Sequence, residues 1–249
     1  MQQLSTHYDP ILVTLSFAVA IVASYAALTT INRLREGGTR RWLWLGAVTF
    51  GLGVWAMHFT AMTALQLGMI VGYDPFLTAL SVVFAIVGAA ISFQLVSKPQ
   101  VSALQVVLSG TALGAGIGVM HYVGMFAMRM DAKLDFELPM VGISVLVAVA
   151  IGTVGIWLLT TPLTRNLPGR YLIAAAVTGS AIPFMHYVAM AAARFSANGT
   201  ATGHIGAYGG LLSVNLVLVL AVVLVSLPMF LTALISTGSE EAGETGQGA

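Results

Sequence analysis

The chain has 249 residues, of which 58% are hydrophobic and 8% are charged, and its mean hydropathy is +0.93. Soluble domains carry about 25% charged residues, so this composition excludes a soluble globular protein and indicates an integral membrane protein. The net charge of +1 offers no basic surface to a nucleic-acid partner, and the absence of cysteine excludes disulfides and thiolate metal sites.

Seven apolar segments follow one another along the chain, and each is long enough to cross roughly 30 Å of hydrocarbon as a helix. They cover about residues 10–31, 42–67, 76–96, 102–128, 139–161, 170–194 and 211–235. The expected fold class is therefore all-α, a polytopic membrane bundle of seven transmembrane helices. We place the membrane domain in residues 1–237. The acidic, glycine-rich residues 238–249 are expected to form a disordered cytoplasmic tail, or the beginning of a linker to an output domain.

The basic residues predict the orientation of these helices. Seven lie in the connections 1–2, 3–4 and 5–6, namely Arg33, Arg35, Arg40, Arg41, Lys98, Arg165 and Arg170. Three lie on the other side, namely Arg129, Lys133 and Arg194. By the positive-inside rule, the N-terminus is outside and the C-terminus is cytoplasmic. No basic residue precedes the first segment, so we expect a retained helix rather than a cleaved signal.

One six-residue motif occurs three times, as MHFTAM at residues 57–62, MHYVGM at 120–125 and MHYVAM at 185–190. The second methionine follows the histidine by four residues, one helical turn, so the two side chains share a helix face. The copies lie on the second, fourth and sixth predicted helices, about 17 to 19 residues from the helix starts, or roughly 25–29 Å of rise. This spacing predicts three repeated helical hairpins with their histidines at one depth, near the outer surface.

Ionisable side chains in a membrane are costly and usually mark a site. A single histidine is often satisfied by an interhelical hydrogen bond, and a single methionine often fills a packing gap. The threefold recurrence instead favours a metal site. Imidazole suits copper, zinc and iron, whereas thioether selects copper(I), so copper leads and zinc and haem are the alternatives.

The first predicted ligands are His58, His121 and His186, with Met62, Met125 and Met190 one turn later. The preceding residues, Met57, Met120 and Met185, point about 100° away and belong to a second site or to packing.

The three MH(Y/F)xxM copies on alternate helices resemble the MHYT domain family, which is named after this motif. The resemblance spans about residues 10–235. It implies a sensor module of the bacterial inner membrane that binds copper through the motif methionines and histidines and detects oxygen, carbon monoxide or nitric oxide. Such modules are often fused to cytoplasmic domains that make or degrade cyclic-di-GMP, or to DNA-binding domains.

The first copy departs from the family pattern, because Phe59 stands where the other copies have Tyr122 and Tyr187. The two tyrosines are candidate cofactor-binding residues that orient an imidazole or a bound water. Their alternative role is an aromatic belt at the membrane interface.

Three functions stay open at this point. The first is a metal-dependent sensor without catalysis of its own, since no general base or nucleophile pair stands beside the histidines. The others are a haem-binding membrane protein and a metal transporter or channel. The expected partners are membrane lipid, a diatomic gas and an output domain in cis, with no nucleic acid contacted by this domain. The oligomeric state is left open, with a homodimer as one option.

Overall fold

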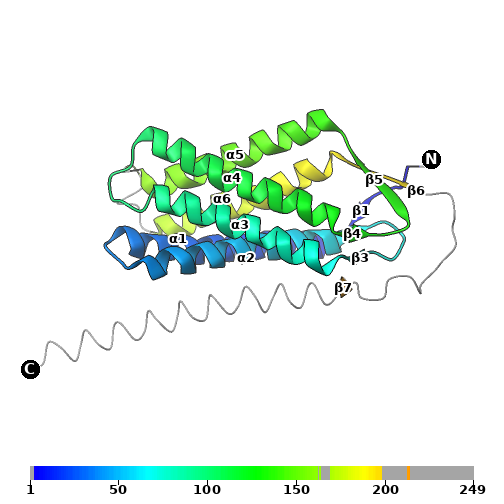
Figure 1. Cartoon of the computed structure of the whole chain (residues 1–249), viewed down its shortest axis with the longest axis horizontal. Helices are drawn as coiled ribbons and strands as arrows, with labels where there is room; N and C mark the ends of the chain where they lie inside the picture. The colour runs from blue at the N-terminus through cyan, green and yellow to red at the C-terminus, as the bar shows by residue number, and fades with distance from the viewer. Residues whose placement is uncertain (1–2, 162, 164–168, 198–211, 214–249) are drawn as a thin grey trace, which may run out of the picture.

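The computed structural model describes residues 3–161, 163, 169–197 and 212–213 (Figure 1). Within these residues, six helices are long and apolar enough to cross a membrane: α1 Pro10–Arg35, α2 Arg40–Ala64, α3 Pro75–Leu95, α4 Ala103–Phe126, α5 Leu138–Thr160 and α6 Arg170–Met190. The expected all-helical integral membrane protein is therefore confirmed for this part of the chain. The seventh expected helix lies outside the described residues, except that Leu212–Ser213 form the short strand β7.

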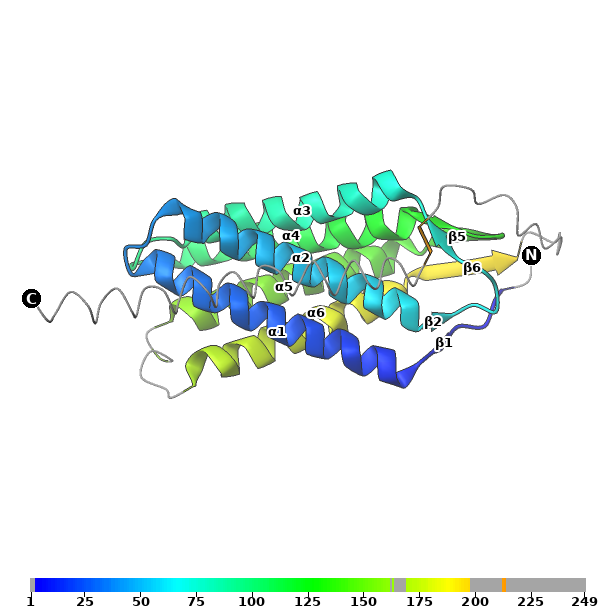
Figure 2. The same ribbon diagram turned by 90° about the horizontal axis from the view of Figure 1, so that it is seen from below.

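The six helices close into a ring. Each helix packs against its neighbours in the chain, and α1 packs against α6 (Figures 1 and 2). The helices that carry the motif, α2, α4 and α6, are more buried than α1, α3 and α5, and α2 also contacts both α4 and α6. The motif helices therefore line the inside of the bundle.

Glycines allow neighbouring helices to approach closely around α4. A Cβ atom on Gly88 of α3 would come within 2.7 Å of the Gly116 Cα in α4. A Cβ atom on Gly110 of α4 would come within 2.3 Å of the Thr153 Cα in α5. Small residues permit such backbone contact between membrane helices, where packing is a main source of association.

An acidic residue precedes each of α1, α3 and α5. Asp9 and Asp74 are N-caps whose carboxylates accept backbone N–H bonds from the first helical turn, and a proline with its preset φ follows each of them. The backbone N–H groups of Asp9, Asp74 and Glu137 also donate to the carbonyls of Ala64, Ala127 and Ala192, at 2.8–2.9 Å. Each alanine lies two residues beyond a motif, so these bonds tie α1 to α2, α3 to α4, and α5 to α6 at the same end.

Short strands cover this end, which we call the strand end; the end where α1, α3 and α5 finish is the loop end (Figure 1). The strands are β1 His7–Tyr8, β2 Leu65–Gln66, β3 Gly72–Tyr73, β4 Met128–Arg129, β5 Ala132–Phe136 and β6 Ala193–Ala197. They pair antiparallel as β1-β2, β5-β6 and β4-β3-β7. The prediction that the sixth helix continues to Arg194 is wrong, because α6 ends at Met190. Arg194 instead pairs with Asp135 in the β5-β6 ladder, which takes over its backbone hydrogen bonding.

Candidate metal centre

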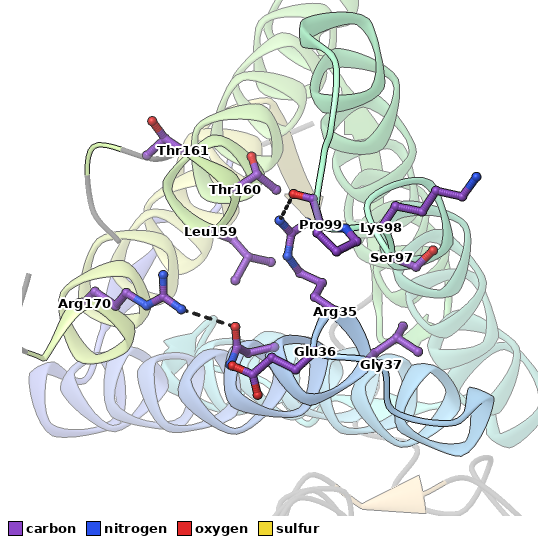
Figure 3. A pocket seen from close by; sticks show the side chains of 12 residues that line it. Arg35, Glu36, Gly37, Ser97, Lys98, Pro99, Leu159, Thr160, Thr161 and Arg170 are labelled. Carbon is purple, nitrogen blue, oxygen red and sulfur yellow. Dashed lines mark hydrogen bonds between the residues drawn. The ribbon is translucent and has the colours of Figure 1, made fainter. Parts of the chain in front are cut away.

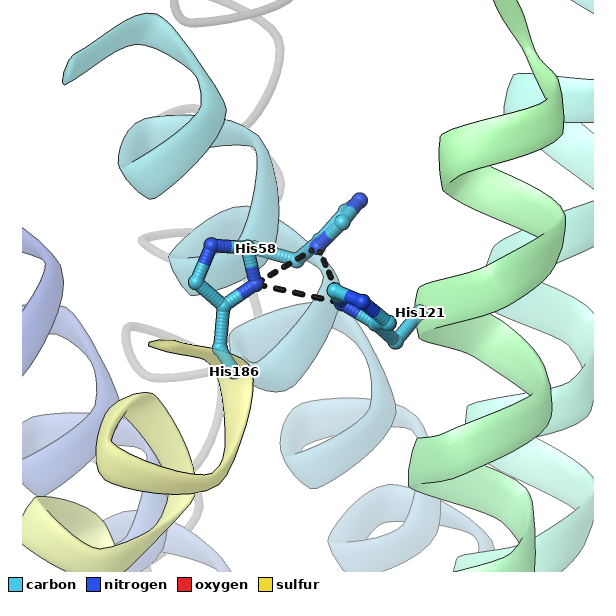
Figure 4. A group of neighbouring side chains, drawn as sticks. All are labelled: His58, His121 and His186. Atoms are coloured by element: carbon cyan, nitrogen blue, oxygen red, sulfur yellow. Dashed lines mark hydrogen bonds between the residues drawn. The ribbon is translucent and has the colours of Figure 1, made fainter. Parts of the chain in front are cut away.

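The three motif histidines lie at one level, near the strand end of the bundle. His58, His121 and His186 stand six, five and four residues before the ends of α2, α4 and α6. Their exposed fractions are 0%, 1% and 1%. Figure 4 shows the three rings turned toward one another from the three helices. The predicted common depth is confirmed, and the side chains also meet.

The imidazole rings form a nearly threefold arrangement. The Nδ1 atom of His58 lies 3.1 Å from that of His186 and 3.3 Å from that of His121, and the remaining Nδ1 pair is 3.2 Å apart. Each pair of rings has its centroids 5.0 Å apart and its planes inclined by 73–80°. The three Nδ1 atoms therefore point at one common position.

Three neutral imidazoles cannot form hydrogen bonds along all three Nδ1–Nδ1 contacts. Each Nδ1 atom is either a donor or an acceptor, so at least one contact joins two donors or two acceptors. The three Nε2 atoms are also buried, and they have no hydrogen-bond partner in the described part of the chain. A central cation would receive the three Nδ1 lone pairs. Nitrogens bound to a tetrahedral ion at about 2.0–2.1 Å lie about 3.3–3.4 Å apart, close to the distances found here. The donor set therefore fits copper or zinc.

The six motif methionines belong to the buried core. Met62, Met125 and Met190, one turn after the histidines, are 3%, 0% and 5% exposed. The preceding residues, Met57, Met120 and Met185, are buried to the same degree. The histidines are therefore the candidate ligands that the structure brings together, and the ligand role of the methionines stays a prediction.

Gly124 is a site residue that the motif alone does not identify. A Cβ atom on Gly124 would come within 2.5 Å of the His58 Nε2 atom. Glycine therefore lets the His58 ring lie against the backbone of α4. The signal in the sequence is weak: the other two copies have alanine at this position, as Ala61 and Ala189.

The aromatic residue after each histidine packs edge-on against its ring, at centroid distances of 4.8–5.0 Å. The hydroxyls of the two tyrosines point to serines on neighbouring outer helices. Tyr122 Oη lies 2.6 Å from Ser144 Oγ, and Tyr187 Oη lies 3.5 Å from Ser16 Oγ. The tyrosines therefore contact the imidazoles through their rings, and their role toward a bound cofactor stays a prediction.

Trp55 supplies the corresponding bond in the first copy, where Phe59 has no hydroxyl. The Trp55 indole N–H donates to Ser81 Oγ and to the Thr78 carbonyl, both at 3.1 Å. Trp55 lies one turn before Phe59, outside the repeated motif, which is why comparison of the three copies does not identify it. All three motif helices thus bond to a serine of a neighbouring outer helix: α2 to α3, α4 to α5, and α6 to α1.

The basic residues at the strand end are all paired with carboxylates. The salt bridges are Arg129–Asp74 at 3.1 Å, Lys133–Asp135 at 2.9 Å and Arg194–Glu137 at 2.6 Å. The Leu77 N–H bond and the charge of Arg129 together hold the pKa of the Asp74 carboxyl below its usual range. The Arg129 and Arg194 pairs join the starts of α3 and α5 to the strands β4 and β6, whereas the Lys133 pair lies within β5.

Comparison with known proteins places the chain in a family. The profile of the MHYT family, described as a bacterial signalling protein N-terminal repeat, matches residues 1–46, 51–109 and 114–171. The chain is 36% identical over 199 residues to the bifunctional diguanylate cyclase/cyclic di-GMP phosphodiesterase MucR of Pseudomonas aeruginosa, covering 77% of this chain and 29% of MucR. It is also 36% identical over 192 residues to the cyclic di-GMP phosphodiesterase NbdA of the same organism, covering 74% of this chain and 24% of NbdA.

A more distant relative is the signaling protein YkoW of Bacillus subtilis, which is 27% identical over 197 residues, or 76% of this chain and 24% of YkoW. The chain thus spans less than a third of the length of these relatives. No solved structure matches the chain. The repeated motif, the six membrane helices and the match over most of residues 1–171 show that this chain belongs to the MHYT family of bacterial signalling proteins.

Proposed function

We propose that the chain is a membrane-embedded, metal-binding sensor domain, with copper as the first candidate for the metal. The observation that carries this proposal is the triangle of buried Nδ1 atoms at 3.1–3.3 Å. His58, His121 and His186 would hold the ion, each from a different helix. Bound copper would supply a redox-active centre with affinity for oxygen, carbon monoxide or nitric oxide.

The donor set alone admits zinc as well, because three imidazole nitrogens suit either metal. The methionine one turn after each histidine favours copper, since thioether sulfur is a soft ligand that selects copper(I). Met62, Met125 and Met190 are all buried close to the ends of the motif helices, one turn beyond the histidines.

Two alternatives receive less support from the geometry. A haem would have to separate imidazoles that are in mutual contact, with ring centroids only 5.0 Å apart. A transporter needs a route to the site from both sides, whereas here the histidines are buried and the strands cover their end of the bundle. A sensor needs neither a macrocycle nor a continuous path.

The signal would leave the site through the motif helices. With the N-terminus outside, as the basic residues predict, α2, α4 and α6 would run from the cytoplasm to the site, in three helix pairs tied by the Asp9, Asp74 and Glu137 backbone bonds. A ligand that binds two arrangements of these helices unequally would shift their populations. The named activities of MucR and NbdA favour cyclic di-GMP turnover as the output, carried by a domain beyond this chain.

Elemental analysis with a visible spectrum tests the proposal on the purified full chain. We expect about one copper ion per chain, as for a single three-histidine site, and no Soret band. His121→Ala should lose the metal, whereas His7→Ala, which changes an exposed histidine of β1, should keep it. Metal content unchanged when each of the three buried histidines is replaced would refute the metal proposal. A Soret band would show that the chain binds haem and would refute the assignment of copper.

A further inference from the structure

A cavity lies at the loop end of the bundle, opposite the histidines. It encloses about 680 Å³ between the last turn of α1, the α3–α4 connection, the end of α5 and the start of α6 (Figure 3). The residues that define its character are Arg35, Lys98, Arg170, Glu36, Asn32 and Leu159. Small-molecule sites usually enclose about 300–1,000 Å³, so the cavity is large enough for a ligand.

The cavity has an excess of positive charge. Arg35, Lys98 and Arg170 face it together with one carboxylate, Glu36. None of these four residues forms a salt bridge within the described residues, whereas the three basic residues at the strand end all do. The Glu36 carboxylate instead accepts a hydrogen bond from the Asn32 amide, at 2.6 Å to its Oε1 atom. Among the described residues, no carboxylate therefore forms a salt bridge with the cationic groups of the cavity.

Neutral oxygens hold the two guanidinium groups in place. Arg35 reaches from the end of α1 to the α3–α4 connection, where it donates to the Val96 carbonyl at 2.6 Å and to the Pro99 carbonyl at 3.1 Å. Arg170 donates to the Asn32 Oδ1 atom at 3.3 Å. A guanidinium has five N–H donors in a rigid fork, so each arginine keeps donors for a further acceptor.

The residues around this end of the bundle are those expected at a membrane interface. Trp44, in the first turns of α2, is 53% exposed, and Trp42 packs under the guanidinium groups of Arg33 and Arg41. Tryptophan and basic residues gather where headgroups meet water. Basic pockets between membrane helices at this level are suited to anionic headgroups.

We propose that this cavity binds a phosphate-bearing anion, with the phosphate between Arg35 and Arg170 and with Lys98 adding charge at its edge. Planar guanidinium groups match phosphate oxygens in pairs, and the fixed arginines need little reordering to bind. The phosphate can belong to an anionic phospholipid or to a soluble molecule, since both present the same group. The inference is independent of the metal proposal, because it uses none of the motif residues.

The test measures binding of phosphatidylglycerol and phosphatidylcholine to the full chain by native mass spectrometry from detergent. We expect phosphatidylglycerol to bind at least about tenfold tighter, and Arg170→Gln to weaken it about tenfold, as the loss of a charged hydrogen bond implies. Lys98→Gln should also weaken it, and this replacement should leave the fold intact because Lys98 is exposed. Lys133→Gln is the matched control, because it removes the same charge at the strand end.

Competition with inorganic pyrophosphate identifies the source of the phosphate. Displacement of phosphatidylglycerol in the wild type, and not in Arg170→Gln, supports a phosphate site that takes a lipid. Binding of pyrophosphate without preference for phosphatidylglycerol supports a soluble ligand at the same site. Equal binding of the two lipids, together with pyrophosphate binding that neither Arg170→Gln nor Lys98→Gln alters, would overturn the proposal.

Discussion

Gly124 sets the position of the His58 ring, since any side chain there would meet the Nε2 atom at 2.5 Å. We expect Gly124→Ala to displace this imidazole, to lower the free energy of unfolding by about 1–3 kcal/mol, and to weaken metal binding at least about tenfold. Unfolding in denaturant and metal titration measure the two effects separately.

Gly118→Ala is the control for this change, because it lies on the same helix and its Cβ atom would meet nothing within 4 Å. It should bind metal as the wild type does, with unchanged or slightly higher stability, because alanine favours helix over glycine. Equal metal affinity in Gly124→Ala and Gly118→Ala would show that His58 does not depend on the glycine.

Trp55 and the two motif tyrosines provide corresponding bonds to serines, and substitution can test this equivalence. Trp55→Phe should lower the free energy of unfolding by about 1 kcal/mol, because it removes the N–H that bonds Ser81 Oγ and the Thr78 carbonyl. Adding Phe59→Tyr to this variant should restore part of the loss, since Tyr122 reaches Ser144 from the same motif position.

Trp44→Phe serves as the control for indole removal, because Trp44 is 53% exposed and should change the free energy of unfolding little. If the double variant is no more stable than Trp55→Phe alone, the three bonds are not equivalent. Denaturant unfolding of the four proteins measures this directly.

Asp74 makes the stability of the strand end depend on pH. Its folded-state pKa lies below the unfolded value of about 3.9, first because it accepts the Leu77 N–H and also because of Arg129. A lowered pKa contributes stability that is present above the unfolded pKa and is lost as pH falls through the folded pKa. We therefore expect the unfolding temperature to fall below about pH 4, and to fall less in Asp74→Asn. An identical pH dependence in both proteins would contradict this role.

At the level of helices, the contact between α3 and α4 is made by backbone. A Cβ atom on Gly88 would lie 2.7 Å from the Gly116 Cα and 2.8 Å from the Ala112 carbonyl oxygen. Both are backbone atoms, so no side-chain rotation can relieve the clash. Gly88→Ala should force the helices apart and lower the free energy of unfolding by about 1–3 kcal/mol. Gly142→Ala, where a Cβ atom would meet nothing within 4 Å, should not. Equal stability of the two variants would mean that the α3–α4 contact adjusts without cost.

The six described helices were predictable because apolar length is a local property that a membrane requires. The common depth of His58, His121 and His186 followed from their distance to the helix starts. The strands were not predictable, since two to five residues pair with partners far along the chain, as Leu134 does with Phe195. The same non-local pairing explains why the sixth predicted helix was too long. Trp55 and Gly124 were missed because their roles depend on neighbouring helices, not on the motif itself.

In the whole molecule, the triangle formed by His58, His121 and His186 links α2, α4 and α6. These three helices otherwise contact mainly the outer helices beside them. α2, α4 and α6 each belong to a different pair tied at the strand end, and the Nδ1 atoms are the place where all three meet. An ion held there would connect the three pairs directly. Its binding would then oppose unfolding of the bundle as a whole, not of one helix alone.

This connection predicts that the metal stabilises the entire helical domain. An ion that binds only the folded state, at 100 times its dissociation constant, adds about 2.7 kcal/mol to the free energy of unfolding. The unfolding temperature should therefore rise on copper addition and fall again on chelation, with all helices melting in one transition by circular dichroism. His186→Ala should remove the rise, and His7→Ala should keep it. An equal rise in both variants would place the stabilising ion outside the triangle, because His186 belongs to the triangle and His7 does not.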